Sequence, residues 1–341
     1  MDELVVGTYE GFVLGYSLRS DDSIQKLKQT FATQSHTASV RCVSIAGKFL
    51  ASGGTDDKIV VIDMKSRKEH TVLMNHDGTI NTVAFTHGGT HLLSQPVTAI
   101  AVHPSDKMAL SIGGDKTLRT WNLIKGRPAF TINLASKGVL LPTEIRFSPG
   151  GDRFSLISQQ TVDVWTISKA GVEKRMTCNS KPTSVQWIDD ERLYVGLENG
   201  NIITLTVTDT QALTYQAHKQ RVKSLHYESE MLYSASSSGE LKVWSVDDSK
   251  LTEICSCNAS CRVTCVTLNR QNHLVKKEEK SDEDEKPETV EDQKDSDSDN
   301  SDLDEKEEVK PKRQKRKPGA FVSISYGDEE EKKAAPPPKK K

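Results

Sequence analysis

Short runs in which apolar and polar residues alternate are the main pattern along this chain, and small or charged residues separate one run from the next. The clearest example is Thr117-Leu-Arg-Thr-Trp121, which follows a turn of small residues and an Asp. Alternation with a period of two predicts a β-strand with one buried face. We therefore expect an all-β chain built from many short strands.

One longer phrase containing this pattern recurs. It is best developed at Ser111–Trp121, where a Ser, a turn of small residues and an Asp precede a strand that closes on Trp. Weaker copies and echoes end near Tyr16, Ile62, Trp165, Leu205 and Trp244. Most of these positions are about 40–45 residues apart, which is the length of a four-stranded unit of a WD-repeat β-propeller. The spacing predicts such a propeller.

Polar residues recur in register with the repeat. In WD-repeat propellers a His, a Ser, the turn Asp and the Trp indole N–H form a buried hydrogen-bonded set, here called a blade tether, because buried polar groups must be paired. We assign nine residues to tethers: His36, Ser52, Asp56, Ser111, Asp115, Trp121, His218, Ser234 and Trp244. The repeat explains these histidines, so catalysis or metal binding is the less favoured alternative. No unit is complete, and the unit of Trp244 has Ser238 in the Asp position.

The third unit is truncated. His76 opens it and two strands follow, up to Ser94, but Gln95-Pro96 then leads directly into Val97-Thr-Ala-Ile-Ala-Val-His-Pro104, which reads as the first strand of the next unit. Roughly 25 residues are missing against the repeat length. Two interpretations are open: a blade fused from two half-blades, or an isoform or gene model that has lost an exon. We favour the second, and either one disturbs strand pairing at this point.

The two ends of the repeat region complement each other. Val5–Tyr16 supplies the middle strands of a blade without an inner one, and residues 261–268 supply an inner strand with nothing after it. We expect these ends to share a blade and close the ring. The propeller is thus assigned to residues 1–275, and an acidic disordered segment, 276–309, and a basic disordered tail, 310–341, follow it.

The region after the propeller carries opposite charges in two blocks, which the overall net charge of −2 hides. Residues 278–308 contain 17 Asp or Glu against four Lys, and residues 310–341 contain 11 Lys or Arg against four Asp or Glu. Few apolar residues remain there, so this region cannot bury enough surface to fold.

Two kinds of site are predicted in these blocks. A dense basic cluster is the candidate nuclear-localisation signal, suited to importin or to rRNA phosphates: Lys310, Lys312, Arg313, Lys315, Arg316 and Lys317. Serines followed by acidic residues are candidate substrates of an acidophilic kinase of the casein kinase type: Ser281, Ser296, Ser298 and Ser301. Solvated charge is the alternative for the basic cluster.

Cysteines and catalytic motifs add little. Four of the six cysteines crowd into residues 255–265, which invites a zinc site, but paired C-x₂-C spacings are missing and a strand would split the side chains between its faces. We expect reduced thiols, no metal and no cofactor. No nucleophile elbow, Walker loop or zincin motif is present, so we expect no enzyme. The chain shows no apolar run of about 18 residues and no signal peptide, so we expect no membrane association.

The sequence from Leu110 to Phe130 closely resembles the p21-activated kinase-interacting WD-repeat proteins, and the similarity extends over residues 3–268. It includes Gly7-Thr-Tyr-Glu10 and His103-Pro-Ser105. The resemblance implies a seven-bladed propeller, of which this chain keeps six full blades and one truncated blade. It also implies a nucleolar location and a role in large-ribosomal-subunit assembly among pre-ribosomal factors, as a monomer within complexes. Binding and inhibition of p21-activated kinase are implied as a second activity.

A different class of function remains as the alternative. WD-repeat propellers also serve as substrate receptors of ubiquitin ligases. That use favours a Trp-Asp-x-Arg exit from a third strand, and the three candidate exits here read Trp121-Asn, Trp165-Thr and Trp244-Ser. The assembly scaffold is therefore the preferred hypothesis.

Overall fold

The computed structural model of the protein describes residues 2–21, 24–74, 76–95, 97–209, 212–247, 250–270 and 322–325. Within these ranges the chain forms β-strands and one 3-10 turn, η1 (Ala135–Lys137). The predicted all-β class is confirmed. The acidic segment 276–309, the basic cluster and the four candidate phosphorylation sites lie outside the described residues. No helix in the described part has the length and apolar character needed to span a bilayer.

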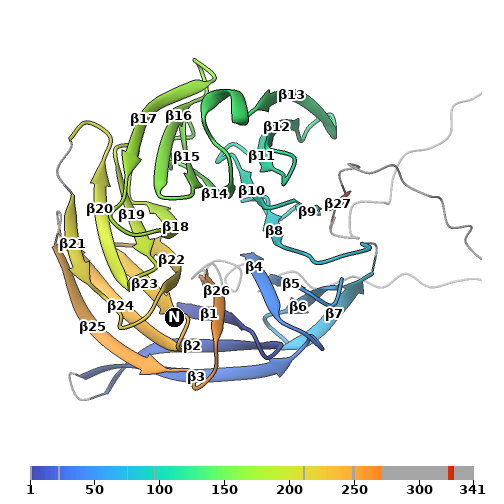
Figure 1. Ribbon diagram of the computed structural model, residues 1–341. Coiled ribbons are helices and arrows are strands. Elements are labelled where there is room, and N and C mark those ends of the chain that lie inside the picture. The colour runs from blue at the N-terminus through green and yellow to red at the C-terminus, as the bar shows by residue number, and fades with distance from the viewer. Residues whose placement is uncertain are drawn as a thin grey trace, which may run out of the picture. The chain divides into compact units, whose positions relative to one another are not determined.

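Six antiparallel four-stranded sheets and one smaller sheet surround a central channel (Figure 1). From the inner to the outer strand, the first two blades are β26 (Val263–Asn269), β1 (Glu3–Thr8), β2 (Phe12–Asp21), β3 (Ile24–Gln34), then β4 (Val40–Ala46), β5 (Phe49–Gly54), β6 (Ile59–Asp63) and β7 (Lys68–Leu73). The third contains β8 (Thr82–Phe85) and β9 (His91–Gln95), and the fourth β10 (Ala99–Val102), β11 (Met108–Ile112), β12 (Thr117–Asn122) and β13 (Arg127–Asn133). The fifth is β14 (Pro142–Phe147), β15 (Arg153–Ser158), β16 (Thr161–Thr166) and β17 (Gly171–Thr177). The sixth is β18 (Pro182–Trp187), β19 (Arg192–Leu197), β20 (Asn201–Thr206) and β21 (Leu213–Gln216), and the seventh is β22 (Val222–Glu228), β23 (Met231–Ser236), β24 (Glu240–Asp247) and β25 (Lys250–Asn258).

The third blade is the one that the sequence predicts to be truncated. Its own strands, β8 and β9, form a hairpin, while β10 begins a separate blade of four strands. The interpretation of a blade fused from two half-blades is therefore wrong, because β9 does not pair with any strand of the fourth blade's sheet. A further strand, β27 (Val322–Ser325), pairs with the other edge of β9. Residues 310–341 are predicted to be disordered, and β27 corrects this prediction at four positions.

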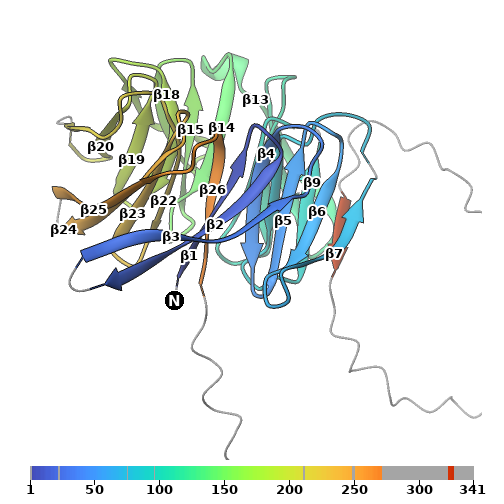
Figure 2. The same cartoon turned by 90° about the horizontal axis from the view of Figure 1, so that it is seen from below.

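The inner strands form a closed ring in spite of the truncation. Strand β8 contacts β4 on one side and β10 on the other, and the remaining inner strands contact their neighbours in turn. The last contact joins β26 to β4, and β26 itself pairs with β1, placing Leu268 opposite Leu4 (Figure 2). The residues missing from the third blade therefore affect the outer part of the ring, not its inner wall.

The hydrophobic core lies between adjacent blades and is uneven. Between the third and fourth blades, the buried cluster in the described residues consists of Leu93, Ala109 and Trp121. The cluster between the first and second blades contains seven buried residues, and the clusters at the other interfaces are larger still. A blade without its own third and fourth strands has less apolar surface to bury, and among the residues whose burial is described this interface has the smallest buried cluster.

Candidate functional site

The tether of the second blade joins the entry to β4 with the β5–β6 turn. The His36 Nδ1 atom lies 2.9 Å from an Asp56 carboxylate oxygen, and its Nε2 atom lies 2.9 Å from the Ser52 hydroxyl. Since a carboxylate only accepts, the His36 Nδ1–H group donates to Asp56. Burial opposes the charge on Asp56, yet hydrogen bonds from His36 and the Thr37 backbone hold the pKa of this carboxyl below its usual value.

The seventh blade has the most complete tether. The Trp244 indole N–H donates to the Ser234 hydroxyl at 2.8 Å, and this hydroxyl lies 2.8 Å from His218 Nε2. His218 Nδ1 lies 2.7 Å from a carboxylate oxygen of Glu240. Burial lowers the pKa of His218 in spite of this carboxylate, so the ring is neutral at pH 7. Glu240 was missed by the sequence analysis because it lies two residues beyond the turn position, which Ser238 occupies.

The fourth blade has only part of a tether. Trp121 donates its indole N–H to Ser111 at 2.8 Å. Asp115, assigned to the same tether, is corrected by the structure: its carboxylate accepts from Thr117 and from the Arg119 guanidinium. The reason is that no His precedes Ser111 in register, so the Asp turns to the donors nearest along the chain.

The structure adds two polar contacts that the sequence analysis did not assign. His76 Nε2 lies 2.8 Å from the Ser94 hydroxyl, so the truncated blade keeps half a tether. Trp187 of β18 donates to Ser155 of β15 at 3.0 Å and thereby joins the sixth blade to the fifth. The contact between His76 and Ser94 could have been predicted, because His76 opens its repeat unit. The contact between Trp187 and Ser155 joins two different blades, so the pattern within one repeat does not predict it.

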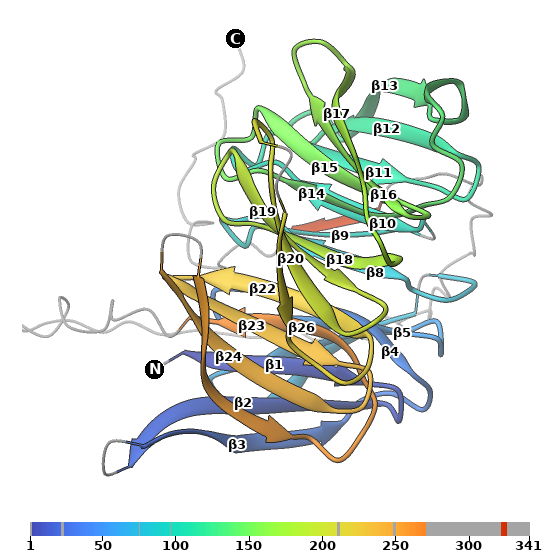
Figure 3. The same cartoon turned by 60° about the vertical axis from the view of Figure 1, so that its left-hand side comes forward.

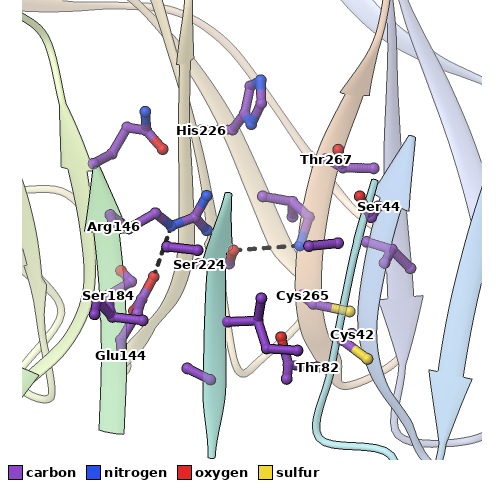
Figure 4. Close-up of a pocket in the computed structure, with 18 of the residues that line it drawn as sticks. Cys42, Ser44, Thr82, Glu144, Arg146, Ser184, Ser224, His226, Cys265 and Thr267 are labelled. Carbon is purple, nitrogen blue, oxygen red and sulfur yellow. Dashed lines mark hydrogen bonds and ion pairs between the residues drawn. The ribbon is translucent and has the colours of Figure 1, made fainter. Parts of the chain in front are cut away.

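A central channel runs between the inner strands. It has a volume of about 690 Å³ and is lined by residues of all seven inner strands. Glu144 and Arg146 form an ion pair on β14, with Nε and Oε1 3.1 Å apart, and Ser224 accepts the backbone N–H of Val266 (Figure 4). Burial raises the pKa of Glu144, and the nearby Arg146 only partly offsets this effect.

The charged lining of the channel is biased towards cations. Burial, followed by the nearby Arg41 and Arg221, lowers the pKa of Lys223. In the described part of the chain, neither Lys223 nor Arg41 forms an ion pair with a carboxylate. His226 is neutral, because burial lowers its pKa to about 3. The channel can therefore accept a polar or anionic group at its wall.

The thiols of the channel are poorly suited to chemistry. Burial raises the pKa of Cys42, and burial raises that of Cys265 to about 11, so both are protonated at pH 7. A thiol becomes a nucleophile or a metal ligand as the thiolate. Among the described residues, no group of three or more His, Cys, Asp or Glu side chains is arranged to hold a metal ion.

Exposed apolar side chains lie on the strands that flank the third blade. Strands β7 and β13 contain no buried residue. Val72 of β7, Met74 just after it and Phe130 of β13 are exposed, with Phe130 accessible over 59% of its surface. Such residues are available to a partner, because large apolar side chains on a surface favour protein contacts.

Comparison with known proteins gives the relationship of the chain. Residues 25–63, 91–122 and 209–245 match the WD domain, G-beta repeat family. The chain is 32% identical over 300 residues to the p21-activated protein kinase-interacting protein 1-like of Xenopus laevis, covering 78% of this chain and 81% of the relative. The chain belongs to the p21-activated protein kinase-interacting protein 1 family. The predicted WD-repeat propeller and the family resemblance are both confirmed.

More distant members extend this family to fungi. The p21-activated protein kinase-interacting protein 1 of Homo sapiens is 29% identical over 306 residues, which cover 77% of this chain and 76% of the relative. The Shk1 kinase-binding protein 15 of Schizosaccharomyces pombe is 27% identical over 277 residues, covering 72% and 78%. Protein MAK11 of Saccharomyces cerevisiae is 22% identical over 342 residues, covering 78% and 82%. The chain is thus a WD-repeat scaffold of this family.

Proposed function

We propose that the protein is a non-enzymatic scaffold in the nucleolar assembly of the large ribosomal subunit, and that it also binds p21-activated kinase directly and lowers its activity. Its partners in assembly are pre-ribosomal factors, among which it acts as a monomer. The basic cluster at 310–317 serves importin and contacts rRNA.

The extent of the family similarity carries this proposal. It covers 78% of the chain, and relatives in vertebrates and in fission yeast are both named for binding a kinase. The ribosomal role rests on the resemblance at Leu110–Phe130 and on the charge blocks of the C-terminal region, which are common in nucleolar proteins.

The chemistry of the described residues supports a binding function. The buried histidines His36 and His218 are held by serine and carboxylate partners within their own blades. Their ring nitrogens are therefore occupied and do not face a substrate. What the propeller offers is a polar channel, turns and exposed apolar strands, and these features suit the docking of other proteins.

The assembly role is tested by depletion. If the protein serves large-subunit assembly, its loss lowers free large subunits and leaves half-assembled translation complexes in a sucrose gradient. Rescue is attempted with the wild-type chain and with a variant carrying alanine at Lys312, Arg313, Lys315 and Arg316. We expect the variant to move to the cytoplasm and to fail in rescue.

A matched control removes the same number of charges elsewhere, at Lys332, Lys333, Lys339 and Lys340, and should remain nucleolar. A normal gradient after verified depletion contradicts the assembly role. Unchanged nucleolar signal for the first variant contradicts the role of the basic cluster.

The kinase role is tested with purified components. The full chain is titrated into p21-activated kinase, and binding and autophosphorylation are followed together. We expect autophosphorylation to fall in proportion to the complex formed. Binding without inhibition contradicts the regulatory part, and no binding at micromolar concentration contradicts both parts. Copurification with ligase subunits, together with a normal gradient, would favour the ubiquitin-ligase receptor instead.

A further inference from the structure

Strand β9 is buried on both faces, as a strand in the interior of a blade is. Leu92, Leu93 and Ser94 are consecutive and all buried, with exposed fractions of 2%, 0% and 3%. Consecutive residues of a strand point to opposite faces, so both faces of β9 are covered. The segment after Gln95 leaves for β10, and the chain next to β9 in sequence therefore supplies no strand on this edge. An uncovered edge of this kind attracts another strand.

Strand β27 fills this edge. It runs antiparallel to β9 and places Val322 opposite Ser94, Ser323 opposite Leu93 and Ile324 opposite Leu92 (Figure 3). The 51 residues between Arg270 and Val322 reach it without constraint, since an extended chain spans about 3.3–3.6 Å per residue.

The register of this pairing is that of a third strand in the intact blades. In the second blade the tether serine, Ser52, lies opposite Val60, and Leu50 lies opposite Ile62. In the fourth and seventh blades, the residue two before the tether serine lies opposite Trp121 or Trp244. Ser94 bonds His76 as a tether serine does. Ile324 lies opposite Leu92, which is two residues before Ser94. In register it therefore corresponds to Ile62, Trp121 and Trp244 of the intact blades.

The sequence of the segment fits the same place. Phe321-Val-Ser-Ile-Ser-Tyr326 alternates apolar and polar residues, whereas charged residues dominate the rest of 276–341. Val322 and Ile324 repeat the residue types of Val60 and Ile62. β-branched residues at alternate positions favour a strand.

From these observations we infer that the outer edge of β9 is a strand-binding site and that its occupant is residues 322–325 of the same chain, which supply the missing third strand of the third blade. Backbone hydrogen bonds provide the attachment, as in other cases of strand addition. This inference is independent of the ribosomal and kinase roles.

Cross-linking tests the register and the occupant together. His91 lies opposite Ser325, so the double substitution His91→Cys with Ser325→Cys should form a disulfide within one chain under mild oxidation. The control, His91→Cys with Ser323→Cys, moves the second thiol two residues out of register and should cross-link at least fivefold less. The six native cysteines are free thiols, and peptide mass mapping separates the designed disulfide from any that these thiols form during oxidation. A disulfide between two chains would show that a second copy fills the edge, and equal cross-linking of both pairs would overturn the register.

Hydrogen exchange on shortened chains gives a second readout. A chain ending at Ala320 lacks the strand, whereas a chain ending at Tyr326 keeps it and loses the terminal lysines. Amides of residues 91–95 that do not pair with β8 should exchange at least tenfold faster in the chain ending at Ala320 than in the chain ending at Tyr326 or in the full-length chain. A peptide of residues 317–327 should restore the protection. Equal exchange in all three chains would overturn the inference, and would leave the edge to a partner protein.

Discussion

At the scale of single residues, Trp121 and Trp165 occupy the same register position in neighbouring blades but have different surroundings. Trp121 lies opposite Ala109 and donates to Ser111, two residues further along β11. Trp165 lies opposite Phe154, so the corresponding position is Leu156. Leucine offers no acceptor, and the Trp165 indole N–H is buried without a hydrogen-bond partner among the described residues. An unpaired buried donor destabilises a fold by about 1–3 kcal/mol.

This difference predicts an unusual mutational result at Leu156. Leu156→Ala leaves a cavity, and a loss of about 2–5 kcal/mol in the free energy of unfolding is expected. Leu156→Ser leaves a similar cavity but adds an acceptor for Trp165, so it should be at least as stable as the alanine variant. Urea unfolding of both variants measures this. As the control, the same pair is made at the buried Ile157, where serine should be the less stable. The prediction is contradicted if the serine variant is less stable than the alanine variant by the same amount at both sites.

Part of the tether network follows from sequence because its spacing is fixed by the repeat. His36 lies 16 residues before Ser52, as His218 does before Ser234, and both pairs are bonded. Glu240 could not be assigned in the same way, since a longer side chain placed two residues further on reaches the same histidine nitrogen. The sequence shows which residue types are present, but not which of two nearby acceptors the fold selects.

The buried His218 makes stability depend on pH. Its pKa is below the usual value in the folded state, mainly because of burial, so the unfolded chain binds the proton first as the pH falls. The contribution of neutral His218 to folding stability is therefore complete above about pH 6.5. Below that pH the free energy of unfolding falls by no more than roughly 1.4 kcal/mol per pH unit on account of this residue. Urea unfolding between pH 7.5 and 5 should show this slope. His218→Gln lowers stability overall but should make the slope shallower, and an unchanged slope contradicts the assignment.

At the scale of elements, the third blade shows both what sequence can locate and what it cannot. The spacing after His76 indicates that strands are missing, because repeat length is a local property. The pairing of β9 with β27 joins residues more than 220 positions apart. Such a pairing depends on which edge the rest of the fold leaves open, so no local pattern specifies it. The alternating run at 321–326 was the available signal, and the charged surroundings concealed it.

Completing the third blade should stabilise the domain. Residues 54–74 of this chain, which contain β6 and β7, are inserted after Gln95 to supply a third and a fourth strand. The addition covers the edge of β9 and enlarges the thin core around Leu93, Ala109 and Trp121. We expect a melting temperature several degrees higher by calorimetry, and higher solubility.

The same insertion also bears on β27. Removing residues 321–341 should lower the melting temperature of the natural chain and leave that of the completed chain unchanged, since the inserted strand now occupies the edge. Equal melting temperatures for the natural and completed chains would show that the ring closes equally well with fewer strands.

At the scale of the whole molecule, the ring depends on a contact between its two ends. Strand β26 pairs with β1 from Glu3 to Thr8, and it also contacts the inner strands β4 and β22. Complementary half-blades at the two ends of the repeat region were enough to predict this pairing. The continuity of the inner ring past the truncated blade was not predictable, because it depends on β8 contacting both β4 and β10.

Chains shortened to different end points should therefore distinguish the contribution of ring closure by β26 from that of the residues after it. A chain ending at Ser260 lacks β26, exposes the edge of β1 and leaves Leu4, Val5 and Val6 without their cover. Because the pairing is between residues more than 250 apart, nothing local replaces it. We expect this chain to lose cooperative unfolding and to expose apolar surface to a dye such as ANS. A chain ending at Gln271 keeps β26 and should unfold cooperatively, with only the edge of β9 altered. Calorimetry on both chains decides the matter: a sharp transition for the chain ending at Ser260 would mean that the ring is held by its blade-to-blade cores, and that closure by β26 contributes little.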